Sequence, residues 1–164
     1  MVGSKGRNPT YDPTAEIRKG GDMMIQTPKF KVGESYTIQK HVTETDTALN
    51  YGSGQLENLF ATPSLVAMMI EASARLLDQQ LPEGFISVGK SVHADHRKPT
   101  TLGETVTVKV TIDESTGNMV KLSMEAFDEV GPIGTGEHVR FVVNKKSLLG
   151  RANQREEALQ SHDF

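Results

Sequence analysis

Five stretches of the chain alternate apolar and polar residues with a period of two, which is typical of β-strands with one buried face. The clearest are residues 104–113 and 119–128, and looser versions occupy 34–43, 85–97 and 133–145. Polar residues fill the alternate positions, which predicts an antiparallel sheet covered on one side. The inward positions that this alternation predicts are Tyr36, Ile38, Val42, Val106, Val108, Val110, Ile112, Val120, Leu122, Met124 and Ala126, while Val139, Phe141 and Val143 mark the last strand.

A helical segment separates the first of these strands from the other four. Thr62 at the N-cap and Pro63 at the first helical position form a strong start signal. The following residues, to about Leu77, are apolar nearly all round, which predicts a buried helix rather than a surface amphipathic one. The turn residues of 81–84 end it. Between the first strand and this helix lies a long connection, 44–58, and a loop of that length in a compact domain is often functional.

The order of strand, long loop, buried helix and four strands predicts an α+β architecture. It is the arrangement of the hotdog fold, in which a five-stranded antiparallel sheet wraps around one buried central helix. One helix cannot cover five strands completely, so we expect a homodimer, with a tetramer as the alternative. The domain spans 28–146, flanked by a polar tail at 147–164 that we interpret as a frayed helix or disordered end. Residues 1–27 are interpreted as a disordered tail or an expression-vector leader, because Met23 or Met24 could be a native start.

Composition narrows the class of protein. The 164 residues carry 18 Lys and Arg against 21 Asp and Glu, a net charge of −3, which argues against a nucleic-acid partner. No cysteine is present, which excludes disulfides, thiol nucleophiles and cysteine-based zinc sites. No apolar run reaches the length of a membrane span, and the first 22 residues lack the apolar stretch of a signal peptide. We therefore expect a cytoplasmic protein with no membrane partner.

Thr62 has two interpretations. As an N-cap, its hydroxyl would satisfy a backbone N–H of the helix. Alternatively, the helix N-terminus would attract the negative charge that develops on an acyl carbonyl, and the hydroxyl would attack that carbonyl or position a water. Pro63 weakens this second interpretation, because it has no N–H to donate.

His96 lies on the strand that follows the helix. In a regular strand it shares the core face with Val88, Val92 and Ala94, although Gly89 could bulge the strand and reset this parity. A lone imidazole on a core face is more often structural than functional. The run His93-Ala94-Asp95-His96 suggests a metal, but residues three apart on a strand face opposite sides, so we expect no metal site there.

The charged residues that could take part in function also have simple structural interpretations. Glu71 is a carboxylate in an apolar helix, and Arg75 at i+4 is its natural salt-bridge partner. Its functional interpretation is a carboxylate that acts on water or orients His96. Four cations could contact an anionic cofactor tail, although bare charges of this kind are usually solvated: Lys98, Arg140, Lys145 and Lys146.

Several short segments, taken together, resemble the fluoroacetyl-CoA thioesterase-like branch of the hotdog thioesterases. They are Phe60-Ala61-Thr62 with the apolar helix, Val88-Gly89, His96, Thr100, Gly103 with Thr105-Val106-Thr107-Val108, and Ile133-Gly134-Thr135-Gly136-Glu137-His138-Val139-Arg140. The resemblance covers about residues 30–144. It implies a hydrolase of small acyl-CoA thioesters that needs no cofactor, with CoA entering only as part of the substrate.

The resemblance also implies a catalytic Thr, Glu and His, placed at Thr62, Glu71 and His96. The carboxylate does not align with the family's catalytic Glu. An ungapped match puts Ile70 at that position and Glu71 one residue later, which is about 100° further round the helix. We expect Tyr51, Phe60, Gly89 and Arg140 to contact the substrate. The alternatives are a non-catalytic acyl-CoA-binding hotdog protein, which the displaced Glu favours, and a hotdog hydratase or dehydratase, whose GDxNPxH-like segment is absent from this sequence.

Overall fold

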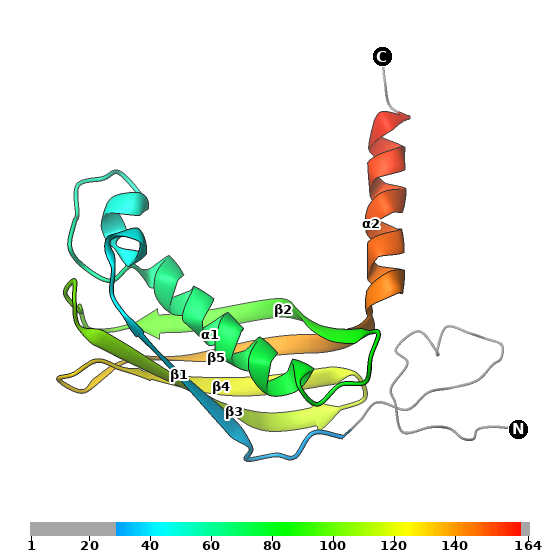
Figure 1. Ribbon diagram of the computed structural model, residues 1–164, viewed down its shortest axis with the longest axis horizontal. Coiled ribbons are helices and arrows are strands. Elements are labelled where there is room, and N and C mark those ends of the chain that lie inside the picture. Colours follow the sequence, from blue (N-terminus) through cyan, green and yellow to red (C-terminus); the bar gives the residue numbers. More distant parts are fainter. Residues whose placement is uncertain (1–28, 162–164) are drawn as a thin grey trace, which may run out of the picture.

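The computed structural model describes residues 29–161, which form one antiparallel sheet, a helix across its concave face and a second helix that stands away from it (Figure 1). The strand order is β1-β3-β4-β5-β2. The strands are β1 (Ser35–His41), β2 (Phe85–His96), β3 (Thr105–Thr116), β4 (Met119–Phe127) and β5 (Pro132–Asn144), and the helices are α1 (Thr62–Asp78) and α2 (Lys145–Gln160). The α+β hotdog architecture predicted from the sequence is confirmed.

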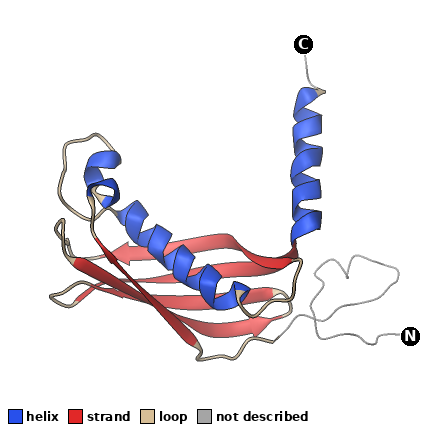
Figure 2. Cartoon of the chain, viewed as in Figure 1, coloured by secondary structure: helices blue, strands red, loops and turns tan. Residues whose placement is uncertain are grey.

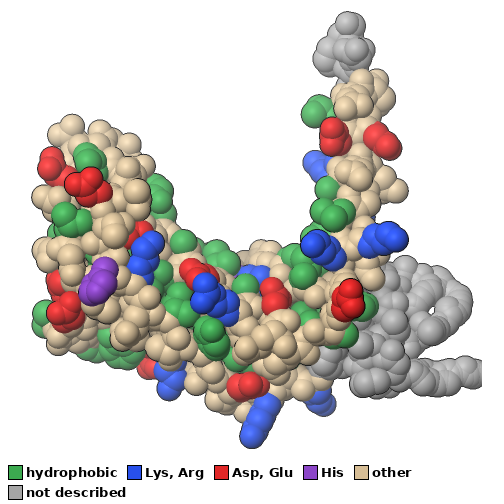
Figure 3. Space-filling model, in the orientation of Figure 1, with side chains coloured by type: hydrophobic (Ala, Val, Ile, Leu, Met, Phe, Trp, Pro, Cys, Tyr) green, Lys and Arg blue, Asp and Glu red, His purple; other side chains and the backbone are tan. Residues whose placement is uncertain are grey.

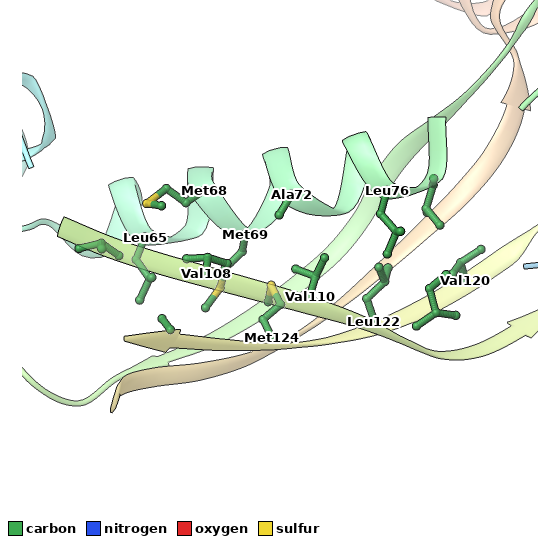
Figure 4. Packing of buried hydrophobic residues seen from close by; sticks show 14 of the residues in the cluster. Leu65, Met68, Met69, Ala72, Leu76, Val108, Val110, Val120, Leu122 and Met124 are labelled. Atoms are coloured by element: carbon green, nitrogen blue, oxygen red, sulfur yellow. The ribbon is translucent and has the colours of Figure 1, made fainter. Parts of the chain in front are cut away.

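The core lies between α1 and the sheet (Figures 2 and 4). The predicted inward faces of β3 and β4 are confirmed: all their apolar members are at most 1% exposed. They meet a stripe of α1 with helical spacing that contains Leu65, Met69, Ala72 and Leu76. The prediction that α1 is buried all round is wrong. Ile70 on its outer face is 37% exposed, because the sheet of a single chain curls around only one side of the helix.

Glycine lets the strands approach α1 closely. A Cβ added at Gly136 on β5 would lie 2.6 Å from the carbonyl oxygen of His93 and 2.6 Å from Met124 Cε, with Met69 Sδ at 3.2 Å. Backbone oxygen cannot move aside as a flexible side chain can, so only hydrogen fits at this position. The absence of a side chain at Gly136 therefore lets β5 pack closely against β2, Met124 of β4 and Met69 of α1.

Strand β2 contains a bulge that changes which residues face the core. Gly89 pairs with Arg140 and Ser91 with Val139, which leaves Lys90 between them unpaired. Beyond the bulge, Val92 and His96 face the same side as their partners on β5. Val88, before the bulge, pairs with Phe141 on the outer face. The expectation that Val88 shares a face with His96 is therefore wrong, because the extra residue shifts the alternation by one.

Helix α2 begins where β5 ends and rises on the same side of the sheet as α1, at the far end from the N-terminus of α1 (Figure 1). The Asn144 side chain caps it by accepting a hydrogen bond from the Ser147 N–H at 2.9 Å. None of its residues is buried. Where the sequence predicted a polar tail, the chain is helical to Gln160, and the tail predicted at 1–27 lies outside the described residues. No helix in the described part of the chain is long and apolar enough to cross a bilayer.

Candidate active site

Thr62 and His96 meet although 34 positions separate them in the chain. Thr62 Oγ1 lies 2.8 Å from His96 Nδ1, a hydrogen-bond distance. Thr62 is the first residue of α1, and His96 is the last residue of β2. The N-cap position belongs to Ala61, whose side chain offers no cap. The expected capping role of the Thr62 hydroxyl is therefore wrong, because this hydroxyl bonds to the imidazole instead.

The pair opens into a cavity of about 420 Å³ beside the N-terminus of α1. Its wall is largely apolar, and no carboxylate contributes to it. The lining residues are Ala48, Tyr51, Gly52, Leu56, Leu59, Phe60, Ala61, Thr62, Pro63, His96, Arg97, Lys98 and Pro99. Ligand pockets of about 300–1,000 Å³ with apolar walls and a few convergent polar groups are typical small-molecule sites.

Burial sets the protonation state of His96. It lowers the pKa of the imidazole below 6.5, and hydrogen bonding with the Lys98 backbone opposes this effect in part. The ring of Phe60 meets the imidazole edge-on, with centroids 6.1 Å apart. Within the described residues, the buried Nε2 has no hydrogen-bond partner at full geometry, so its contact with the Lys98 backbone is a weak one. In the tautomer of the neutral ring that carries its proton on Nε2, Nδ1 accepts the hydrogen bond of the Thr62 hydroxyl.

The 44–61 segment that forms one wall is anchored at both ends. Asp46 accepts hydrogen bonds from the Thr43 N–H and hydroxyl and pairs with Lys40 at 2.6 Å. Burial of Asp46 acts to raise its pKa, but Lys40 and Thr43 outweigh it, so the pKa lies below its ordinary value. Close to the site, the Phe60 N–H donates to the Thr100 carbonyl and the Ala61 N–H to the Asp46 carbonyl. These bonds hold Phe60 and Thr62 in place.

The structure brings together Thr62, His96, Tyr51 and Phe60, but not the other expected site residues. Glu71 is about half exposed on the outer face of α1 and pairs with Arg75 at 2.6 Å, as its alternative interpretation predicted. Gly89 and Arg140 do not line the cavity. A Cβ at Gly89 would lie 3.3 Å from His138 Cε1, so this glycine faces two buried side chains of β5.

Arg140 is only 5% exposed, and this burial contradicts its expected contact with an anionic cofactor tail. Its Nε donates to Ser87 Oγ at 2.9 Å, its Nη2 donates to the Ser87 carbonyl at 2.7 Å, and its Nη1 lies 3.1 Å from His138 Nε2. Asp78 in turn accepts from the Ser87 N–H and hydroxyl. Burial lowers the pKa of Arg140, and nearby Asp78 opposes this.

His138 completes this buried network, and the sequence analysis gave it no role of its own. Its Nδ1 lies 2.8 Å from the Ser91 carbonyl, and burial is the main cause that lowers its pKa. The signal that could have found it is the alternation itself. His138 and Arg140 share a face with the buried Val142, while the marked residues Val139, Phe141 and Val143 lie on the other face.

The suspected metal run divides between the two faces of the sheet. His93 pairs with Glu137 and His96 with Gly134 across β5, so the two imidazoles point to opposite sides. His93 Nε2 instead lies 3.4 Å from Asp95 Oδ2. Within residues 29–161, no group of three acidic, histidine or cysteine side chains is arranged to hold a metal ion.

A hydroxyl–imidazole pair at the mouth of an apolar cavity, on a hotdog sheet, defines a hotdog protein equipped for acyl chemistry. Residues 42–146, more than half of the chain, match the family described as fluoroacetyl-CoA-specific thioesterase. The chain belongs to this family and is a thioesterase, which confirms the resemblance seen in the sequence.

Individual relatives agree with the family match. The fluoroacetyl-CoA thioesterase of Streptantibioticus cattleyicolor is 29% identical over 101 residues, which cover 62% of this chain and 73% of that protein. The structure of a hot-dog-like protein from Thermanaerovibrio acidaminovorans is 38% identical with a TM-score of 0.73, covering 77% of this chain and 93% of that one. A thioesterase superfamily member from Thermus thermophilus is 27% identical with a TM-score of 0.72, covering 78% and 96%.

Proposed function

We propose that the protein hydrolyses a small acyl-CoA to the free acid and CoA, with Thr62 as the nucleophile and His96 as the general base. The observation that carries this proposal is the 2.8 Å contact between Thr62 Oγ1 and His96 Nδ1. It gives the arrangement expected of an activated nucleophile, a hydroxyl within hydrogen-bond reach of a neutral base. Further support comes from a structure of a threonine-to-serine mutant of the fluoroacetyl-CoA thioesterase FlK in complex with acetyl-CoA.

In the first half of the reaction, His96 Nδ1 takes the hydroxyl proton while Thr62 Oγ1 attacks the thioester carbonyl. The new C–O bond forms, the C–S bond breaks, and the imidazolium returns the proton to the leaving thiolate. In the second half, His96 removes a proton from water, and the resulting hydroxide attacks the acyl carbon. The bond to Thr62 then breaks, and the proton returns to the Thr62 oxygen.

The start of α1 offers a donor for the oxyanion that forms in each half. Within the described part of the chain, the Thr62 N–H has no acceptor, whereas the N–H groups of Ser64 and Leu65 both bond to the Ala61 carbonyl. The N-terminal end of the helix dipole adds positive potential at the same place. Apolar walls that include Leu59 and Phe60 exclude water from the acyl group and strengthen both effects.

We also propose that the working enzyme is a homodimer formed by antiparallel pairing of two β2 strands. In the described sheet β2 pairs only with β5, and Asp78 takes up the Ser87 N–H near the start of this 12-residue strand, so the outer edge beyond Ser87 is open to a second copy. Val92 near the middle of this edge strand is 40% exposed although it lies on the core side of the sheet. The uncovered outer face of α1 also fits a partner alongside.

The test is thiol release from a panel of short, branched and aromatic acyl-CoAs. We expect Thr62→Ala and His96→Ala to lower kcat/KM at least a hundredfold, because each removes half of the nucleophile–base pair. Lys109→Ala, an exposed substitution on β3, is the matched control and should leave turnover unchanged. No cysteine in the chain contributes background thiol.

Three outcomes bear on this proposal. Trapping of an acyl group on Thr62 by mass spectrometry would establish covalent catalysis. Retention of most activity by Thr62→Ala, with loss in His96→Ala, would replace it with direct attack by a water that His96 activates. Acyl-CoA binding without hydrolysis by the wild type would refute the proposed reaction and leave a binding protein.

A further inference from the structure

Helix α2 carries charges that its own stability does not require. Its first half holds Lys145, Lys146 and Arg151 and no acidic residue, whereas Glu156 and Glu157 follow in the second half beside Arg155. Figure 3 shows basic side chains at the base of this helix and acidic ones further along it. Two lysines in the first turn stand at the positive end of the helix dipole, where cations are disfavoured. Among the described residues, no carboxylate pairs with these three cations, and all three are exposed.

These cations cannot serve the cavity of their own chain. The Lys145 N–H bonds to the Gly84 carbonyl, which ties the base of α2 to the start of β2. His96 stands at the other end of this 12-residue strand, about 35 Å away at ~3.3 Å per residue. Figure 1 shows the same separation, with α2 and the N-terminus of α1 at opposite ends of the sheet.

A dimer paired through β2 brings the two ends together. Antiparallel pairing of identical strands requires a two-fold axis perpendicular to the sheet, which keeps α1 and α2 of both copies on the same side. The register that sets the two strands end to end places the start of one β2 opposite the end of the partner's β2, where His96 lies. The base of α2 then stands beside the mouth of the partner's cavity, whose rim already carries Arg97 and Lys98.

We propose that α2 of each subunit binds the phosphate groups of the CoA held in its partner's cavity, through Lys145, Lys146 and Arg151. This inference rests on the proposed function and its dimer. CoA carries its phosphates at the far end of the pantetheine arm from the thioester, so cations that bind them belong at the mouth of the cavity and not at its floor. The family match ends at residue 146 and so takes in only the first two residues of α2, Lys145 and Lys146.

The test compares an acyl-CoA with the same acyl group on N-acetylcysteamine, a thioester without phosphates. In the triple variant Lys145→Gln, Lys146→Gln and Arg151→Gln, we expect the KM for acyl-CoA to rise on the order of tenfold with kcat unchanged. The kcat/KM for the N-acetylcysteamine thioester should not change. The matched control, Lys31→Gln with Lys109→Gln and Lys121→Gln, changes the net charge equally at exposed positions elsewhere and should leave both substrates unaffected.

A mixed dimer tests which cavity α2 serves. One subunit carries His96→Ala, and the other carries the α2 triple variant, so the only working cavity belongs to the chain with the altered α2. If α2 binds the CoA held by its partner, this mixed dimer has a wild-type KM for acyl-CoA. The intact α2 then comes from the subunit that carries His96→Ala. A raised KM in this mixed dimer, or an unchanged KM in the triple variant, would overturn the inference. Failure of wild-type protein to hydrolyse either thioester would instead refute the proposed function.

Discussion

Thr62 shows how far a single residue can be interpreted without its neighbours. Its position at a helix start predicts a cap, and that local argument is sound for most threonines. The structure uses the hydroxyl differently because His96, brought in by β2 from 34 positions away, lies 2.8 Å from it. Only the family resemblance linked the two residues in the sequence, since no local pattern encodes a contact made by tertiary packing.

Burial of His96 leads to a prediction about pH. A lowered pKa keeps the imidazole neutral, and therefore able to accept a proton, at pH values where an ordinary histidine would be charged. We expect kcat/KM to fall on the acid side as the imidazole becomes protonated, with the midpoint of this fall at a lower pH than an ordinary histidine would give. Initial rates at a series of pH values with a short acyl-CoA measure the acid limb. A midpoint above 6.5 would contradict the assignment of His96 as a desolvated base.

Arg140 was expected to contact an anionic substrate, but the structure places it in the core. An arginine near the end of a sequence motif suggests a contact with an anion, but β5 places it on the core side, where Ser87 and His138 bind it. Strand parity alone would have given this answer, since positions 138, 140 and 142 share one face. The apolar residues at 139, 141 and 143 misdirected the interpretation because both faces of β5 are partly covered.

At the scale of secondary-structure elements, the alternation in β3 and β4 predicted the core almost residue by residue, because the period of two is regular from Val106 to Ile112 and from Val120 to Ala126. In strand β2 the alternation failed at one place to predict which side chains face the core. The bulge at Lys90 adds a residue that a pattern of period two cannot reveal, although Gly89 signalled that the strand could be irregular there. The bulge sets the face on which His96 lies, so the position of the base depends on it.

The close packing around Gly136 of β5 predicts that adding a single methyl group there lowers the free energy of unfolding. Gly136→Ala would place a Cβ 2.6 Å from the His93 carbonyl oxygen and beside Met124 and Met69. We expect the free energy of unfolding to fall by about 1–3 kcal/mol, with Tm several degrees lower. Thermal and urea unfolding measure the change.

Gly131→Ala is the matched control for this substitution. No atom lies within 4 Å of a Cβ at Gly131, so its Tm should stay near that of the wild type. Equal stability of the two variants would show that β5 does not pack against the His93 backbone, Met124 and Met69 as closely as described.

At the scale of the whole molecule, the proposed dimer predicts a mass of twice 17.9 kDa by light scattering. Val92→Asp would place two carboxylates near the two-fold axis of the paired β2 strands, and we expect this variant to dissociate towards monomers and lose activity on acyl-CoA. Val130→Asp introduces the same charge at a loop position that is 91% exposed and should remain a dimer. A dimer that persists in Val92→Asp would place the interface elsewhere.

The two edges of the sheet differ, and the difference limits how far copies can assemble. The edge strand β2 is 12 residues long and is open beyond Ser87, whereas the edge strand β1 has 7 residues, with Gln39, Lys40 and His41 exposed at its end. Pairing of β2 with β2 consumes both long edges and closes the assembly at two subunits. Pairing of β1 with β2 would instead leave one edge of each kind free and propagate without end, as in a fibre. The short, polar β1 edge thus protects the chain against open-ended polymerisation, even at high concentration.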